Sequence, residues 1–325
     1  MQATSYKKRV AVLRGGPSSE YEFSMLSGNG VLKALADSPY VTKDIIISKK
    51  GEWLVKGFVK SPEQALMDID IVFIALHGTY GEDGTVQRIL ERLTLPYTGS
   101  GPYASAIAMN KLHTKEFLKK HTDTVKMAPH MKITKEGTAN VPKLVHTITE
   151  MFGPEYVIKP ISGGSSVGTK LIDQAGLLKA VLESLEENSE ILIEKRIKGR
   201  EATVGILENF RDQMHYQLPE IEIVPPQSAS FFSADVKYNG ETEEICPGRF
   251  SKEEKKELLD TALQVHKTLG LRQYSRSDFI VSDGGIYFLE VNTLPGLTAQ
   301  SLFPKSIAAV GGSYKELVMH LLETA

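Results

Sequence analysis

The chain has 325 residues, 41% of them hydrophobic and 24% charged, with a formal net charge of −2 at pH 7. This composition is typical of a globular protein, and the length suggests two or three domains. The balanced charge excludes an overall field that would attract nucleic acid or an anionic membrane. The single cysteine, Cys246, excludes an internal disulfide and favours a reducing compartment. We find no signal-type apolar segment and no apolar run near the ~20 residues that span a bilayer, so we expect a cytoplasmic protein without nucleic-acid or membrane partners.

Residues 1–110 alternate between strand-like and helix-like segments. Strands are expected at 9–16, 43–48, 69–78 and 95–99, and helices at 19–37 and 84–93. The third strand is apolar almost throughout, which is typical of a parallel strand covered on both faces. The alternation predicts an open parallel α/β sheet.

The stretch PISGGSSVG, residues 160–168, is rich in glycine and serine and follows Lys159, which ends an apolar segment. Its glycine spacing resembles that of the common phosphate-binding loop, but such a loop leads into a helix, and the following TKLID is typical of a strand. We therefore expect a hairpin flap in which loop amides, serine hydroxyls and Lys159 hold phosphate. The alternative for Lys159 is a surface lysine whose stem packs on apolar neighbours.

Beyond the flap, the pattern predicts a helix at 175–188, strands at 190–197 and 200–207, and an amphipathic helix at 251–270. Residues 225–248 lack sustained periodicity. A loop of that length in a compact domain is usually either functional or disordered, and its aromatic residues favour an ordered lid over a solvated tail.

A β-hairpin is predicted around Asp283-Gly284-Gly285. In the expected register Ser282 pairs with Ile286, and Asp278 lies opposite Glu290. The opposite face, directed at a core, would carry Phe279, Val281, Leu289 and Val291.

Asn292 shares the face of Asp278 and Glu290 in this register. Like charges opposite each other destabilise a sheet unless something compensates. Two carboxylates and an amide oxygen are ligands that suit Mg²⁺. The alternative is a solvated strand face, which Ile280 and Phe288 on the same face make less favourable.

Several charged residues are candidates for nucleotide contacts. Lys111 stands near a helix start, where most lysines are simply exposed. Glu194, Lys195 and Glu201 follow or begin apolar strands and could border a base and ribose, although surface charge is an equally fair interpretation.

Three further residues are candidates for substrate contacts. Glu20 and His77 lie at the carboxyl edge of the predicted sheet, where α/β proteins bind ligands; a helix-start acid and a buried, satisfied histidine are the alternatives. Arg276 could neutralise an oxyanion or merely pair with Asp278.

Six segments together resemble the ATP-grasp superfamily and, within it, the D-alanine–D-alanine ligases. They are VAVLRGGPSSEYEFSMLSG, ALHGTYGEDGTVQ, LPYTGSGPYASAIAMNKLHTK, VIKPISGGSSVG, EKRIKGREATVGIL and SRSDFIVSDGGIYFLEVNTLPGLTAQSLFP. The resemblance implies an N-terminal open parallel α/β sheet followed by an ATP-grasp fold of two α+β subdomains with antiparallel sheets. Its domains would be 1–110, 111–200 with the glycine-rich flap, and 201–325 with the lid and the metal site, in a protein that forms a homodimer.

The resemblance also implies roles for individual residues. The ATP phosphates and nucleoside would contact Lys111, Lys159, Ser165, Ser166, Glu194, Lys195, the backbone at Ile197, Glu201 and Lys237. Two Mg²⁺ ions, replaceable by Mn²⁺, would bind Asp278, Glu290 and Asn292. The residues acting on the amino acids would be Glu20 at the first ammonium, His77 near its carboxylate, Arg276 and the backbone at Gly296 at the oxyanion, Ser165 in the flap, Tyr238 on the lid, and Ser301 and Leu302 at the second D-alanine.

The implied reaction joins two D-alanines through an acyl phosphate made from ATP, for peptidoglycan precursor synthesis. Ala299 and Gln300 depart from the family's common serine-histidine pattern, and Gly163 replaces a common acidic residue. A second substrate such as D-lactate, D-serine or another amino acid is therefore the alternative. A nucleotide-binding regulator without catalysis is the rival from another class, which the intact set of metal-ligand candidates disfavours.

Overall fold

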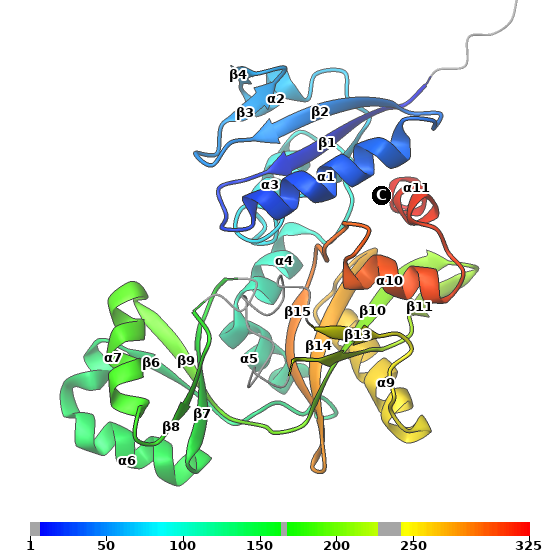
Figure 1. Cartoon of the computed structure of the whole chain (residues 1–325). Helices are drawn as coiled ribbons and strands as arrows, with labels where there is room; N and C mark the ends of the chain where they lie inside the picture. Colours follow the sequence, from blue (N-terminus) through cyan, green and yellow to red (C-terminus); the bar gives the residue numbers. More distant parts are fainter. Residues whose placement is uncertain (1–6, 164–167, 227–241) are drawn as a thin grey trace, which may run out of the picture.

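The computed structural model describes residues 7–163, 168–226 and 242–325, which are arranged around three β-sheets (Figure 1). The N-terminal sheet lies at the top of Figure 1, and two antiparallel sheets lie below it, one on each side. The predicted combination of a parallel α/β sheet with two antiparallel sheets is confirmed.

The N-terminal sheet has the strand order β4-β3-β2-β1-β5. Its central strands β1 (Arg9–Gly15), β2 (Val41–Ile47) and β5 (Ile71–Ile74) are parallel. An antiparallel hairpin that the sequence did not predict, β3 (Trp53–Val55) and β4 (Phe58–Lys60), extends the edge. The helices of this region are α1 (Tyr21–Leu35), α2 (Pro62–Ala65), α3 (Thr85–Arg92), α4 (Pro102–Met109) and α5 (Lys111–His121).

The prediction of a strand at 95–99 is wrong. Only one bridge forms there, between Val72 and Tyr97. Pairing stops because Gly99 adopts a left-handed φ of 94° and turns the chain toward α4.

The four-stranded sheet has the order β6-β9-β7-β8 and is antiparallel throughout. Its elements are β6 (His130–Thr134), the 3₁₀ helix η1 (Glu136–Asn140), α6 (Val141–Phe152), β7 (Glu155–Pro160), β8 (Lys170–Asp173), α7 (Leu177–Glu187) and β9 (Glu190–Lys195). β7 and β8 pair directly, so the predicted strand–loop–strand around the glycine-rich stretch is confirmed. Ser165 and Ser166 lie outside the described residues.

The third sheet has the order β13-β12-β10-β14-β15, with β11 paired to β10. Its elements are β10 (Arg200–Phe210), β11 (Gln213–Gln217), β12 (Ile221–Val224), β13 (Glu243–Ile245), α9 (Lys252–Thr268), β14 (Tyr274–Ser282), β15 (Gly285–Asn292), α10 (Leu302–Ala309) and α11 (Tyr314–Glu323). β13 falls inside the expected lid 225–248, and Lys237 and Tyr238 of that lid lie outside the described residues.

The β14–β15 hairpin has the predicted pair of acids opposite each other, but its register near the turn differs from the predicted one. Ser282 pairs with Gly285, so the expected pairing of Ser282 with Ile286 is wrong. Asp278 nevertheless lies opposite Glu290, as predicted, because the register shifts between Asp278 and the next residue.

The register shift leaves Leu289 as the extra residue of a β-bulge, since Phe279 pairs with Phe288 and the next pair skips one position. Two predicted side-chain directions are therefore exchanged. Phe288 is buried in the core against Phe279, and Leu289 lines a cavity on the other face.

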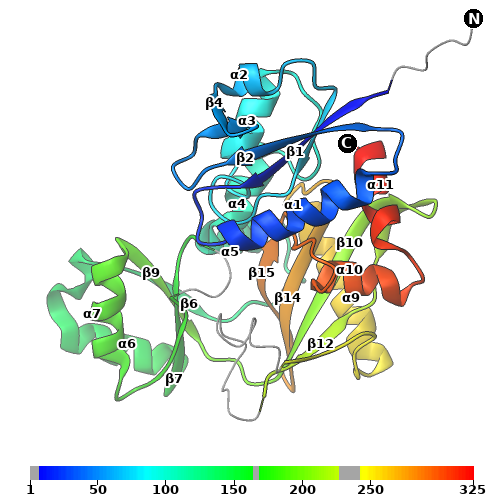
Figure 2. The ribbon, with the colours of Figure 1, turned by 45° about the horizontal axis from the view of Figure 1, so that its top comes forward.

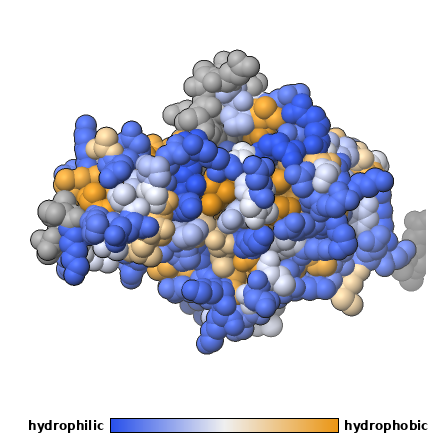
Figure 3. Space-filling model, turned by 90° about the horizontal axis from the view of Figure 1, so that it is seen from below, coloured by the Kyte–Doolittle hydropathy of each residue, from blue (hydrophilic) through white to orange (hydrophobic). Residues whose placement is uncertain are grey.

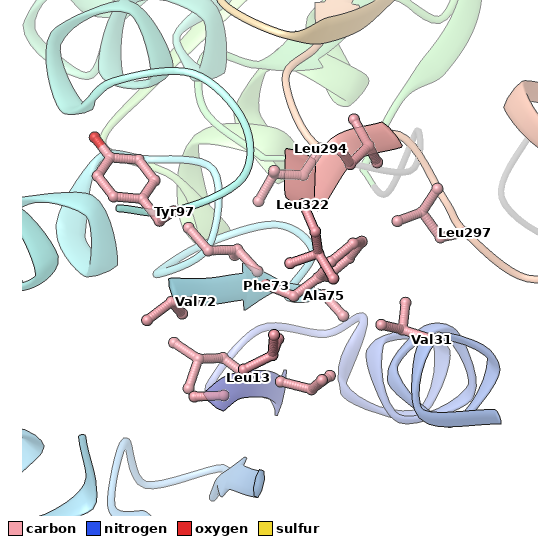
Figure 4. Close-up of a cluster of buried hydrophobic side chains, with 14 of the residues drawn as sticks. Leu13, Val31, Val72, Phe73, Ala75, Tyr97, Leu294, Leu297 and Leu322 are labelled. Atoms are coloured by element: carbon pink, nitrogen blue, oxygen red, sulfur yellow. The ribbon is translucent and has the colours of Figure 1, made fainter. Parts of the chain in front are cut away.

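One hydrophobic core joins the two ends of the chain. Leu13, Val31 and Phe73 of the N-terminal region belong to the same buried cluster as Leu294, Leu297 and Leu322 (Figure 4). Helices α1 and α11 lie side by side in two views (Figures 1 and 2). The N-terminal sheet is therefore packed directly onto the C-terminal part of the chain.

Among the helices of the described residues, none combines the length and the apolar character needed to cross a membrane. The face seen in Figure 3 is mainly hydrophilic, with hydrophobic residues in small separate areas.

Replacing Phe73 with alanine should lower the free energy of unfolding by about 3–5 kcal/mol, because the side chain fills the shared core. Phe58, in the same sheet, is the matched control: its side chain is 71% exposed, so Phe58→Ala should change stability by no more than about 0.5 kcal/mol. Urea unfolding of both variants measures the difference. Equal losses would contradict the placement of this core.

Candidate active site

A cavity of about 790 Å³ is bounded by segments from all three sheet regions. Most of the predicted site residues line it, namely Glu20, His77, Lys111, Lys159, Glu194, Lys195, Ile197, Glu201, Arg276, Asp278, Glu290, Asn292, Gly296, Ser301 and Leu302. The remaining four, Ser165, Ser166, Lys237 and Tyr238, lie outside the described residues. The structure thus brings together residues from positions 20 to 302.

Asp278 and Glu290 face each other across the hairpin, and each is paired with a cation. Arg276 binds Asp278 in a bidentate pair, with Nε–Oδ1 and Nη2–Oδ2 distances of 3.1 Å. Lys111 Nζ lies 3.0 Å from Glu290 Oε2 and donates a hydrogen bond to the carbonyl oxygen of Gly163 (2.9 Å). Lys111 is therefore not the exposed helix-start lysine that was the alternative.

The donor set around Asp278 fits a hard divalent cation. Asn292 Nδ2 donates to Asp278 Oδ2 (3.2 Å), so the amide oxygen of Asn292 is oriented away from that bond. Thr203 Oγ1 donates to Asp278 Oδ1 (2.5 Å) and helps to fix the carboxylate. Within the described residues, no group of three or more His, Cys, Asp or Glu side chains is placed to hold a metal. A cation here would depend on Asn292 and on oxygens supplied by a bound phosphate, which is how Mg²⁺ usually binds with nucleotides.

A buried cluster of charged side chains holds Lys159 in place. Glu194 lies between two lysines, with Oε2 2.7 Å from Lys159 Nζ and Oε1 2.8 Å from Lys115 Nζ. Burial opposes the charged form of Glu194, but Lys115 and Lys159 outweigh it and hold the pKa of its carboxyl below the usual value. Burial opposes the charge of Lys159 as well, yet Glu194, with Glu290 and Glu201, raises the pKa of the Lys159 amine.

This arrangement was not predicted from the sequence. Each oxygen of Glu194 is paired with a lysine, so its carboxylate holds the Lys159 ammonium at the cavity. Lys115 on α5 is one of the residues that sequence reasoning missed. Its position one helical turn after Lys111 on the same helix was the available signal. Burial lowers the pKa of the Lys115 amine, against the opposing effect of Glu194.

One end of the cavity has the character of a base-binding site. Its apolar lining includes Val157, Leu171, Ile280 and Leu289. Lys195, Ile197 and Glu201 border this end, and the neighbouring Arg196 forms an ion pair with Glu155 (2.9 Å). A planar ring could lie between the apolar side chains while polar groups meet its edge.

The other end of the cavity lies against the N-terminal region. Glu20 stands just before α1, close to Gly78, where a Cβ would lie 2.7 Å from Glu20 Oε2. Gly78 also has a left-handed φ of 69°, so glycine is needed there on both grounds. A carboxylate at this place suits a substrate ammonium group.

His77 is buried, and both of its ring nitrogens have partners. Nδ1 lies 3.0 Å from the carbonyl oxygen of Leu294, and Nε2 lies 2.8 Å from Ser27 Oγ. Because a carbonyl only accepts, Nδ1 carries the proton. Burial lowers the pKa of His77, although Glu20 opposes the effect, so the neutral ring accepts a hydrogen bond from Ser27. The alternative of a satisfied histidine therefore describes His77 correctly.

Glu82 is a cavity residue that sequence reasoning missed. Its carboxylate is almost buried and accepts hydrogen bonds from the N–H groups of Gly78 (2.8 Å) and Leu294 (3.0 Å). Burial, and next Glu20, raise its pKa to about 7, against the lowering effect of the two N–H groups and Arg276. Its position in the glycine-rich turn after β5 was the available signal.

The segment after β15 forms the last wall. A Cβ at Gly296 would lie 2.7 Å from the Phe23 ring and 2.9 Å from Ser301 Oγ, so a side chain does not fit there. Ser301 Oγ accepts a hydrogen bond from the N–H of Thr298 (3.1 Å) and precedes α10. Of the two positions that depart from the family's serine-histidine pattern, Gln300 lines the cavity and Ala299 is not among its lining residues.

Charged residues that were not predicted stand near this wall. Lys305 on α10 pairs with Glu244 on β13, and both line the cavity. The pair connects the strand after residues 227–241 to the helix that Ser301 precedes.

Two antiparallel sheets that border a cavity of lysines and carboxylates define an ATP-grasp fold. Family models described as "D-ala D-ala ligase N-terminus" and "D-ala D-ala ligase C-terminus" match residues 55–100 and 118–323. The chain belongs to the D-alanine–D-alanine ligase family.

Individual relatives agree with the family models. The chain is 40% identical to a D-alanine–D-alanine ligase of Geobacter sulfurreducens, with 98% of this chain and 94% of the relative covered. It is 36% identical to one from Leptospira interrogans serogroup Icterohaemorrhagiae serovar Lai, with 97% of each covered.

Solved structures are similar over the same length. A Bacillus anthracis D-alanine–D-alanine ligase complexed with ATP has a TM-score of 0.80 and 34% identity, covering 98% of this chain and 97% of that one. The VanG D-Ala:D-Ser ligase from Enterococcus faecalis has a TM-score of 0.82 and 25% identity, covering 98% and 99%.

Replacing Glu194 with glutamine should lower the free energy of unfolding by about 3–5 kcal/mol at pH 7, because two buried ammonium groups lose their common counter-charge. The folded-state pKa of Glu194 is below its ordinary value of 4.5, so its contribution is present above that pH and is lost as the pH falls further. The difference in the free energy of unfolding between wild type and Glu194→Gln should therefore become smaller as the pH falls below about 4.5.

Glu190→Gln on the same strand is the control. Glu190 pairs with Lys132 (3.1 Å) with both side chains well exposed, so its loss should cost no more than about 1 kcal/mol. Urea unfolding of the three proteins at several pH values makes the comparison. If the loss of unfolding free energy in Glu194→Gln stays constant with pH, the result would argue against the charge cluster.

Proposed function

We propose that this chain uses ATP and Mg²⁺ to join two D-alanines into D-alanyl-D-alanine for peptidoglycan precursor synthesis. The observation that carries the proposal is the content of one cavity. Asp278, Glu290 and Asn292 stand beside Lys111 and Lys159, across from a carboxylate suited to an ammonium group. A site that transfers phosphate to an amino acid needs both halves of that set.

The proposed reaction has two steps. First, the carboxylate of one D-alanine takes the γ-phosphoryl group of ATP, and ADP leaves. The neutral amine of the second D-alanine then attacks the carbonyl carbon of the acyl phosphate, and the C–O bond to phosphate breaks as the amide forms. The amine proton is released, so atoms and charges balance.

The chain's own residues position the reactants and stabilise charge. Lys111 and Lys159 would hold transferring phosphate oxygens, and Glu20 would hold the ammonium of the first D-alanine. Arg276 and the Gly296 amide would stabilise the oxyanion, which is usually the largest contribution in acyl transfer. Ser165, Ser166, Lys237 and Tyr238 belong to this proposal on family resemblance alone.

Two Mg²⁺ ions, or Mn²⁺, would be held by Asp278, Glu290 and Asn292 together with ATP oxygens. Bound there, the metal would neutralise charge on the phosphates. The same carboxylates pair with Arg276 and Lys111 in this structure. A divalent cation would compete with both side chains for these oxygens, which favours their contact with phosphate and oxyanion instead.

The second substrate is the finer point. Gln300 lines the cavity next to Ser301 and departs from the common family pattern, so D-serine or D-lactate is the alternative acceptor. We also propose a cytoplasmic homodimer, on family resemblance alone.

Phosphate release from ATP tests the function directly. The purified protein is given D-alanine, D-serine, D-lactate and L-amino acids, singly and in pairs with D-alanine. We expect D-alanine alone to stimulate release strongly, with a dependence on Mg²⁺. If phosphate release is stimulated only by D-alanine together with a second compound, the result would favour the alternative acceptor. If none of the compounds stimulates release, the ligase proposal is refuted.

Glu290→Gln should reduce kcat by at least about 100-fold, because the metal and Lys111 lose a charged ligand and partner. Its thermal unfolding should stay cooperative. Glu257→Gln, at an exposed position on α9, should match wild type. Normal turnover in Glu290→Gln would refute the metal assignment.

A further inference from the structure

Leu294 has both of its backbone polar groups bound by side chains from the N-terminal region. Its N–H donates to Glu82 Oε1 (3.0 Å), and its carbonyl oxygen accepts from His77 Nδ1 (3.0 Å). The two partners lie more than two hundred positions earlier in the chain. The plane of the peptide on each side of Leu294 is thereby fixed by the N-terminal region.

Leu297 is held in a similar way. Its N–H approaches Ser27 Oγ (3.4 Å), and its carbonyl oxygen accepts from the hydroxyl of Tyr314 (2.6 Å). Ser27 lies 2.8 Å from His77 Nε2. With the proton of His77 on Nδ1, the Ser27 hydroxyl donates to Nε2 and keeps a lone pair for Leu297, so all the bonds are mutually consistent.

Gly296 lies between these two anchored residues. We infer that Ser27, His77 and Glu82 are positioning residues that set the direction of the Gly296 amide, so that the N-terminal region controls the group expected to stabilise the oxyanion. This inference rests on the proposed function, because the role of Gly296 belongs to it. Ser27, His77 and Glu82 contact the loop, and this role does not require them to touch the substrate.

Hydrophobic packing alone would not give this control. Leu294 and Leu297 are buried in the shared core, which fixes where the loop lies (Figure 4). Apolar contact is not directional, whereas hydrogen bonds weaken steeply with angle. Ser27 and His77 are buried too, and burying polar groups is costly unless their hydrogen bonds are made. The directional bonds are what apolar packing cannot supply.

The chain provides a matched control one turn earlier on α1. Ser24 and Ser27 are both fully buried. Ser24 Oγ donates to the carbonyl of Ala75 (2.8 Å) and accepts from the N–H of Gly15 (2.8 Å), both within the N-terminal region. Ser24→Ala and Ser27→Ala therefore delete the same buried hydroxyl, but only the second releases the loop.

We expect the two serine variants to lose similar thermal stability and to differ in turnover. Ser27→Ala should lower kcat about 10-fold, since small misplacements of catalytic groups cost this much or more, with the KM for ATP unchanged. Ser24→Ala should retain kcat within about 2-fold. Glu82→Gln, whose amide N–H would face one of the two N–H donors, should also lower kcat. Its effect combined with Ser27→Ala should be smaller than the product of the two single effects, because both act on one loop.

Hydrogen exchange gives a readout that does not depend on activity. Mass spectrometry of peptides covering residues 293–300 should show faster exchange in Ser27→Ala and Glu82→Gln than in wild type and Ser24→Ala. Equal exchange and equal kcat in the two serine variants would overturn the inference. A wild-type protein that releases no phosphate with any amino acid would instead refute the proposed function, and the exchange comparison would still decide whether the loop is held in this way.

Discussion

Two carboxylates held face to face across the β14–β15 hairpin are the constraint on which the rest of the site depends. Asp278 and Glu290 cannot share that place without positive charge beside them. Arg276 supplies it to one acid and Lys111 to the other. Since Lys111 also binds the carbonyl of Gly163, the requirement for charge balance reaches the edge of the glycine-rich stretch. The cations at this end of the cavity are thus the counter-charges of the acids on the hairpin.

The sequence was enough to predict this hairpin and its pair of acids. The pairing of Asp278 with Glu290 was predicted with a turn that was one residue too long, and the bulge at Leu289 restored the pair. Alternation along a strand predicts which residues share a face, but it cannot reveal a bulge, because the extra residue is set by packing. The prediction that Phe288 shares the face of Asp278 and Glu290 was therefore wrong. Strand–loop–strand around the glycine stretch was predictable because it depends on local pattern only.

What the sequence could not predict depends on contacts between distant segments. Glu82 and Lys115 are ordinary acidic and basic residues by pattern, and their importance follows from partners that lie far along the chain. The shared core is the physical reason these partners meet. Burial of Leu294 among residues of the N-terminal sheet brings the loop after β15 within reach of the turn that carries Glu82. Hydrophobic packing sets the approach, and polar groups then fix the orientation.

His77 shows how one buried group gives that orientation a direction. The carbonyl of Leu294 needs a donor, so Nδ1 must keep its proton. If Nε2 were protonated as well, it would donate to Ser27 Oγ, and the hydroxyl proton of Ser27 would lose its acceptor in a buried place. Burial lowers the pKa of His77 and so favours the one protonation state in which every donor has an acceptor. The neutral ring, rather than a charge, is what makes His77 suited to connect α1 with the loop that carries Gly296.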